Sequence, residues 1–204
     1  MSSDPSRNTV DIPALIGSRI CHDLISPIGA IGNGIELLTM SGASVGPELS
    51  LISESVANAN ARIRYYRLAF GQSGQDQATS RTEVQSILRD LYGGSRLRID
   101  WTLSVDCGRM EAKAALLAVQ CMETAMPFGG RLEVSRSDGQ WRIVGEAPKL
   151  RVDPETWAIL EGDAAAVVEL TPALVHFALL PETVADLGRT LSVTRSDEKI
   201  VLTY

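Results

Sequence analysis

Histidine and cysteine are scarce in this sequence of 204 residues, which has two histidines and three cysteines. The cysteines, Cys21, Cys107 and Cys121, are odd in number and lack the spacing of metal ligands. This pattern argues against a disulfide framework and favours a reducing compartment, in which the three thiols serve as small buried hydrophobic residues. We therefore expect no metal site and a cytoplasmic protein.

Long apolar segments are also absent. No run approaches the ~18 residues that a membrane-spanning helix requires, and the first residues, MSSDPSRNTVD, lack the apolar core of a signal peptide. Apolar residues still make up 45% of the chain, enough for one or two compact domains. The net charge of −6 disfavours a broad nucleic-acid-binding surface. We therefore expect neither a membrane nor a nucleic acid as a partner.

A polar segment divides the chain. Residues 71–80 read GQSGQDQATS, with two glycines and Ala78 as the sole apolar residue, which is typical of a linker. We predict three parts: a helical hairpin over residues 1–72, a linker over residues 73–80, and a mixed α/β part over residues 81–204.

The N-terminal part predicts two long helices. The first begins at Asp11 as N-cap, with Pro13 in the first turn, and ends at about Met40. The second extends from about Gly46-Pro47 to Gly71. Both carry apolar residues at alternating spacings of three and four, the heptad pattern of bundled helices. These seam residues are Ile20, Leu24, Ile28, Ile31, Ile35 and Leu38, then Leu49, Ile52, Val56, Ala59, Ile63, Tyr66 and Phe70.

A hairpin of this length cannot bury its apolar residues alone, because each helix hides only one face. Dimerisation into a four-helix bundle covers the remaining surface economically. The alternative is that the C-terminal part covers the hairpin. We predict the homodimer.

The C-terminal part predicts an α+β sandwich. Ser80-Arg81-Thr82-Glu83 matches a capping box that opens a helix to about Leu91, and Asp138-Gly139 is a strong β-hairpin signal. We expect further helices at residues 109–126, 154–160 and 172–186. We expect strands at residues 98–104, 131–137, 140–146, 190–195 and 200–203.

His22 points away from the apolar seam when the first helix is projected at about 100° per residue. Small and polar residues lie within about 40° of the same direction, above and below the ring. They are Ser18, Ser26, Gly29 and Asn33. Another protein can therefore approach the ring closely. Small residues also serve packing, and a lone exposed histidine is usually inert, so geometry alone leaves both interpretations open.

The neighbours of His22 favour a chemical role. Asp23 can orient the ring, support it electrostatically or take its proton when a ring nitrogen acts as a nucleophile. An unperturbed imidazole has a pKa of about 6.5, so a neutral fraction exists at neutral pH. Pro27 frees the backbone carbonyl of Asp23 and costs ~3 kcal/mol inside a helix, which indicates a functional bend or a tolerated kink.

The segment HDLISPI, residues 22–28, resembles the phosphoacceptor box of two-component histidine kinases. That box reads histidine, acid, aliphatic, any residue, small polar, proline, aliphatic. The longer segment SRICHDLISPIGAIGNGIELL is similar to the ChpT-type histidine phosphotransferases of alphaproteobacterial cell-cycle signalling. The resemblance extends over the whole chain in the order helical hairpin, linker and kinase-like domain, with nearly all its specificity in the first 40 residues.

By this resemblance, His22 is the phosphorylated residue and Asp23 its supporting acid. His22 would accept a phosphoryl group from an aspartyl phosphate on one receiver domain and pass it to the aspartate of another. The receiver would supply Mg²⁺, and this chain would bind no cofactor. Receiver docking is expected at Ser18, Arg19, Ser26, Pro27, Gly29, Asn33, Arg64 and Arg67, with Asn60 and Arg62 nearby. A solvated helix face remains the alternative for the residues of the second helix.

Histidine kinases bind ATP in their C-terminal domain, and three motifs for doing so are missing here. All four asparagines precede the linker, so no asparagine is left to help hold Mg²⁺. The segment IVGEAPKLR has one glycine and no aspartate where the adenine motif belongs, and ELTPALVHF opens a helix without a glycine-rich phosphate turn. We therefore expect no ATP binding.

Two other functions remain open. The first is an active kinase with an atypical ATP site, in which Glu123 or Glu146 substitutes for the missing asparagine. The second is a non-catalytic dimeric adaptor for receiver domains. His176 has no cysteine or histidine near it in the sequence, and we expect a packing or surface residue.

Overall fold

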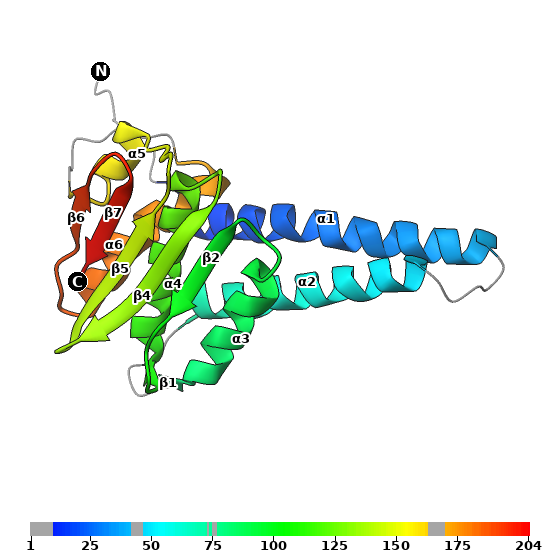
Figure 1. Ribbon diagram of the computed structural model, residues 1–204, viewed down its shortest axis with the longest axis horizontal. Coiled ribbons are helices and arrows are strands. Elements are labelled where there is room, and N and C mark those ends of the chain that lie inside the picture. Colours follow the sequence, from blue (N-terminus) through cyan, green and yellow to red (C-terminus); the bar gives the residue numbers. More distant parts are fainter. Residues whose placement is uncertain (1–9, 42–46, 73, 75–76, 163–169) are drawn as a thin grey trace, which may run out of the picture.

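The structure is a computed structural model that describes residues 10–41, 47–72, 74, 77–162 and 170–204. A long helical hairpin projects from a mixed α/β domain (Figure 1). The hairpin consists of α1 (Ile12–Ser41) and α2 (Pro47–Ala69). Asp11 caps α1 as predicted, because its carboxylate accepts a hydrogen bond from the Ala14 N–H at 3.0 Å. The helix continues through Pro27 without interruption.

Small residues hold the two helices of the hairpin together. Gly34 of α1 lies so close to α2 that an added Cβ would stand 2.5 Å from Ile52 Cγ1. Ser55 and Ala59 of α2 are buried. Several large apolar residues of the predicted seam are instead exposed in the single chain. They are Ile28, Ile35, Leu49, Val56 and Ile63, here named the heptad stripe.

The C-terminal domain covers the base of the hairpin, where α1 begins and α2 ends. Tyr65, Leu68 and Ala69 of α2 belong to the core of that domain, and Ile20 of α1 packs against it. The alternative in which this domain covers the hairpin is therefore correct for its base. The heptad stripe remains uncovered within the single chain.

Part of the predicted linker is ordered into the domain. Ala78–Thr79 form β1, which pairs antiparallel with β3 (Cys107–Gly108). Residues 73, 75 and 76 lie outside the described part of the chain. Ser80 caps α3 (Arg81–Tyr92) as predicted, since its hydroxyl accepts from the Thr82 N–H at 3.2 Å.

The domain is built on a five-stranded sheet in the order β2-β4-β5-β7-β6. Strand β2 (Leu97–Trp101) runs parallel to β4 (Gly130–Ser137), and α4 (Arg109–Ala125) lies between them in the chain. The other pairs are antiparallel. They involve β5 (Gln140–Glu146), β6 (Ser192–Arg195) and β7 (Lys199–Thr203).

The predicted β-hairpin between β4 and β5 is confirmed, with positive φ at Asp138 (53°) and Gly139 (81°). The helices α4 and α6 (Val175–Asp186) pack on each other as a layer beside the sheet (Figure 1). The predicted helix at 172–186 begins with a 3₁₀ turn, η1 (Pro172–Leu174), and α5 (Pro154–Ala158) is shorter than predicted. The α+β class is confirmed.

Two expectations from composition meet different outcomes. No helix among the described residues is long and apolar enough to cross a membrane. Cys107 and Cys121 are buried as expected, whereas Cys21 is exposed. The prediction for Cys21 is wrong because the residue lies next to His22 on the side of α1 that the domain does not cover.

Candidate functional site

His22 stands on α1 with 84% of its side chain exposed. The helical projection predicts this, because the seam residues turn the opposite side of the helix toward α2. Its ring Nδ1 lies 3.1 Å from Asp23 Oδ1. The opposite nitrogen, Nε2, therefore faces away from the only carboxylate that contacts the ring in the described structure.

Asp23 is held more tightly than its position beside an exposed histidine suggests, with only 10% of its side chain exposed. Its Oδ2 accepts a hydrogen bond from Arg19 Nε at 2.7 Å and a short one from the Tyr66 hydroxyl, and Arg62 Nη1 lies 3.7 Å away. Burial opposes its ionisation. The hydrogen bonds from Tyr66 and His22 and the charge of Arg19 outweigh burial, so the pKa of Asp23 lies below its usual value.

This geometry fixes what the imidazole can do. An ionised carboxylate at Nδ1 favours the tautomer that carries its proton there. The lone pair of the neutral ring is then on Nε2, which makes that atom a nucleophile open to an approaching electrophile. His22 therefore supplies a nucleophilic nitrogen, and Asp23 supplies the carboxylate that supports it.

The predicted docking residues separate into two groups. Ser18, Ser26, Gly29 and Asn33 are exposed beside His22, and a Cβ added to Gly29 would meet nothing within 4 Å. Ile25, which is 69% exposed, adds an apolar contact to this surface, here named the histidine face. The histidine face comprises Ser18, His22, Ile25, Ser26, Gly29 and Asn33.

The other predicted docking residues have different surroundings. Pro27 is buried and does not lie on the histidine face. Arg19 turns inward to Asp23 and donates from Nη1 to the Ala173 carbonyl at 2.9 Å. Arg64 and Arg67 form ion pairs with α3, to Asp90 and Glu83, each at 3.2 Å. Docking at these four residues remains a prediction, and in the structure the three arginines also connect the hairpin to the C-terminal domain.

Helical projection of the sequence does not identify the partners of Asp23 on the second helix. It places Tyr66 in the apolar seam and Arg62 near the predicted docking charges. Both lie on one face of α2, four residues apart, and an arginine and a tyrosine at that spacing opposite an acid are a detectable signal. Glu83, expected in the capping box, instead pairs with Arg67.

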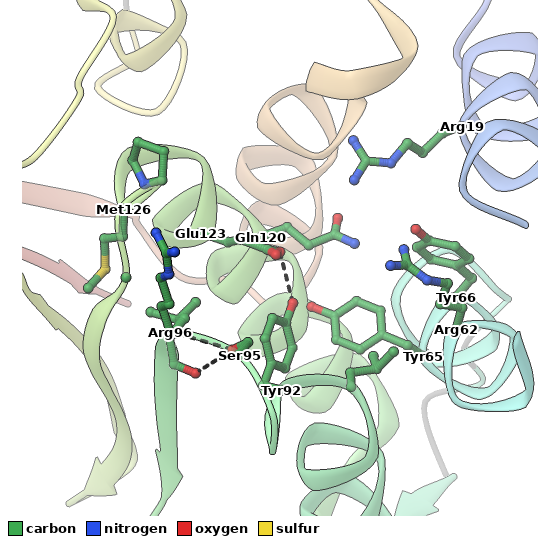
Figure 2. Close-up of a pocket in the computed structure, with 14 residues that line it drawn as sticks. Arg19, Arg62, Tyr65, Tyr66, Tyr92, Ser95, Arg96, Gln120, Glu123 and Met126 are labelled. Carbon is green, nitrogen blue, oxygen red and sulfur yellow. Dashed lines mark hydrogen bonds between the residues drawn. The ribbon is translucent and has the colours of Figure 1, made fainter. Parts of the chain in front are cut away.

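A cleft of about 520 Å³ lies between the base of the hairpin and the C-terminal domain, beside Arg19 and Tyr66, the hydrogen-bond donors to Asp23 (Figure 2). Arg19 and Arg62 line it on the hairpin side, and Gln120 and Glu123 line it on α4. Glu123 accepts a hydrogen bond from the Tyr92 hydroxyl at 2.8 Å. The described residues include no group of three or more side chains suited to a metal ion.

Glu146, one of the two substitutes considered for the missing asparagine, and His176 both lie outside this cleft. Glu146 pairs with Lys199 at 2.7 Å on the exposed side of the sheet. His176 is buried with its Nε2 3.3 Å from Thr124 Oγ1, and burial lowers its pKa to about 3. It is therefore a neutral packing residue, one of the two roles predicted for it.

Comparison with known proteins agrees with this arrangement. Residues 81–199 match the histidine phosphotransferase C-terminal domain. The protein phosphotransferase ChpT of Brucella abortus (strain 2308) is 34% identical over 170 residues, which cover 80% of this chain and 81% of the relative.

Among solved structures, a bacterial phosphotransferase superposes with a TM-score of 0.77 at 28% identity, covering 99% of each chain. The histidine kinase AdeS of Acinetobacter baumannii gives a TM-score of 0.42 at 12% identity, over 89% of this chain and 95% of that one. The domain match covers more than half of the chain, and the ChpT relative exceeds 30% identity over most of both sequences. This chain therefore belongs to the ChpT-type histidine phosphotransferase family.

Proposed function

We propose that this chain is a phosphohistidine carrier in a phosphorelay. His22 takes a phosphoryl group from the aspartyl phosphate of one receiver domain and passes it to the aspartate of another. The observation that supports this most directly is a largely exposed imidazole whose Nδ1 contacts a largely buried, ionised carboxylate. The relative named protein phosphotransferase ChpT supports the same reaction class.

The proposed transfer forms one bond and breaks one. The Nε2 lone pair of His22 attacks phosphorus, the P–N bond forms, and the P–O bond to the donor aspartate breaks, releasing its carboxylate. The ring becomes more positive as the bond forms, and Asp23 stabilises that charge through the Nδ1 proton. The second receiver reverses the step. Each receiver brings its own acidic pocket and Mg²⁺, so this chain supplies the nucleophile and its position.

The histidine face is the proposed receiver-docking surface. Its small residues let a receiver backbone approach the ring, and Ile25 offers an apolar anchor beside it. Because Arg64 and Arg67 are engaged with α3, we place them outside this surface.

Label transfer tests the proposal. A receiver domain carrying labelled aspartyl phosphate is mixed with the wild-type chain, with His22→Ala and with Cys21→Ala, an exposed neighbour that serves as the matched control. We expect label on the wild type and on Cys21→Ala but none on His22→Ala. Labelling of His22→Ala at the wild-type rate would overturn the carrier. Receiver binding without any transfer would identify the adaptor instead.

We further propose that the chain neither binds ATP nor phosphorylates itself. The sequence lacks the kinase motifs, and Glu146, one of the possible substitutes, is paired on the exposed side of the sheet. Calorimetry with ATP and Mg²⁺ should show no heat of binding. Measurable affinity together with autophosphorylation of His22 would establish the kinase.

The heptad stripe supports a homodimer. Ile28 and Ile35 on α1 are seven residues apart, as are Leu49, Val56 and Ile63 on α2, and all five are exposed in the single chain. Such a stripe is the seam of a helical bundle. Val56→Glu should convert the dimer to a monomer in light scattering, whereas Ala57→Glu, at an exposed adjacent position, should leave it dimeric. A wild-type monomer would refute the dimer.

A further inference from the structure

The two oxygens of the Asp23 carboxylate contact different partners. Oδ1 lies against Nδ1 of His22, while Oδ2 accepts from Arg19 and from the Tyr66 hydroxyl. Rotation of the carboxylate out of this orientation would move Oδ1 away from Nδ1 of the ring. Two donors on Oδ2 oppose that rotation, because turning the group weakens both hydrogen bonds at once.

The two donors are themselves fixed by the C-terminal domain. Tyr66 is 6% exposed and stacks on Phe70 with ring centroids 5.2 Å apart. It also meets Tyr65 edge to face, and the Tyr65 hydroxyl donates to the Leu116 carbonyl of α4 at 2.7 Å. The aromatic side chain that holds Asp23 is thus part of the domain core.

Arg19 makes a second, direct connection. Its Nε donates to Asp23 at 2.7 Å while its Nη1 donates to the Ala173 carbonyl in η1 at 2.9 Å. One guanidinium therefore joins the acid beside His22 to a segment about 150 residues later in the chain. Arg19 and Tyr66 bind the carboxylate oxygen that does not contact His22, so their hydrogen bonds are connected to the reacting ring through the carboxylate.

We propose that Tyr66 and Arg19 are positioning residues that lock the Asp23 carboxylate against His22 Nδ1, and that this lock is a function of the C-terminal domain. The inference rests on the proposed carrier function and assigns a role to the half of the chain that does not hold the histidine. Arg62, 3.7 Å from Asp23, and Glu123 across the cleft complete the charges around the carboxylate and do not contact the ring in the described structure.

The first test removes one hydroxyl. Tyr66→Phe keeps the stacked ring and loses the hydrogen bond to Asp23. Tyr92→Phe is the matched control, because its hydroxyl lines the same cleft and donates to a different carboxylate, Glu123. We expect Tyr66→Phe to slow labelling of His22 about tenfold, with Tyr92→Phe at the wild-type rate. Equal rates for the two variants would overturn the proposal.

The second test reads the ring directly. Nitrogen NMR of the unphosphorylated protein distinguishes the two neutral tautomers, and the spectrum is simple because the chain has only two histidines. We expect the Nδ1-protonated form of His22 in the wild type and in Tyr92→Phe. We expect a mixture of tautomers in Tyr66→Phe and in Arg19→Gln. An unchanged tautomer in both variants would refute the lock.

A double-mutant cycle separates positioning from general loss of structure. If Tyr66 acts through Asp23, then Tyr66→Phe should cause no further loss of rate in an Asp23→Asn background. Additive losses would show that Tyr66 only stabilises the fold. Arg109→Gln controls for Arg19→Gln, because Arg109 also joins hairpin and domain by donating to a backbone carbonyl, that of Arg67, at 2.8 Å.

The outcomes distinguish this inference from the carrier function. If His22→Ala accepts label, the carrier itself fails. If His22 is required but Tyr66→Phe and Arg19→Gln transfer at the wild-type rate, the carrier stands and the lock is wrong.

Discussion

Gly29 allows the histidine face to be tested separately from the fold. It lies seven residues after His22, about 10.5 Å further along the helix and about 20° from the same direction. A methyl group placed there by Gly29→Ala would meet nothing within 4 Å in the chain. Glycine inside a helix costs about 1 kcal/mol relative to alanine, so the substitution should stabilise the protein. A rise in Tm of about 2–4 °C corresponds to that change in a chain of this size.

The same methyl group should impede the receiver. If a receiver backbone packs against Gly29, the added atom must be accommodated in a close interface, and overpacking costs about 1–3 kcal/mol. That range corresponds to a loss of about five- to 150-fold in transfer rate. Gly32→Ala is the matched control, since Gly32 is equally open on α1 but points about 80° away from His22.

The assay combines thermal unfolding with label transfer from a phosphorylated receiver. Both variants should melt above the wild type, and only Gly29→Ala should transfer slowly. Transfer by Gly29→Ala as fast as by Gly32→Ala would refute docking at this part of the face. A lower Tm for Gly29→Ala would refute the view that its glycine serves contact with another protein and not packing within the chain.

Three further predictions concern the fold. Burial lowers the pKa of His176 to about 3, so below pH ~6.5 the unfolded chain binds a proton that the folded chain does not. As the pH is lowered from about 6.5 toward 3, His176 should therefore reduce the free energy of unfolding by about 1.4 kcal/mol per pH unit. Urea unfolding of His176→Gln should lack this contribution. Glu111→Gln should lower the free energy of unfolding by about 3 kcal/mol, because it leaves Arg136 and Arg189 without their shared carboxylate. An unchanged denaturant midpoint would contradict this. Gly34→Ala should melt below Gly32→Ala because its methyl group collides with the facing helix, and equal melting temperatures would count against that packing.

Much of the fold could be predicted from local patterns. The capping residue Asp11, the turn at Asp138-Gly139 and the apolar periodicity of the helices each act over a few residues, and the structure confirms them. The surroundings of Pro27 and of the arginines of α2 could not be predicted in this way. Whether such a residue faces a partner or another part of its own chain depends on contacts that helical projection does not contain.

By itself, the sequence determined the helical hairpin, the α+β domain and an outward His22 beside an acid, because helix periodicity and neighbouring residues place these features without long-range information. Only the tertiary structure decided how Asp23 is held. Two of its partners, Tyr66 and Arg62, come from α2, and a third, Arg19 of α1, also reaches η1, so the carboxylate is fixed by packing between segments distant in sequence. Hydrogen bonds of this kind form only when the chain has brought those segments together.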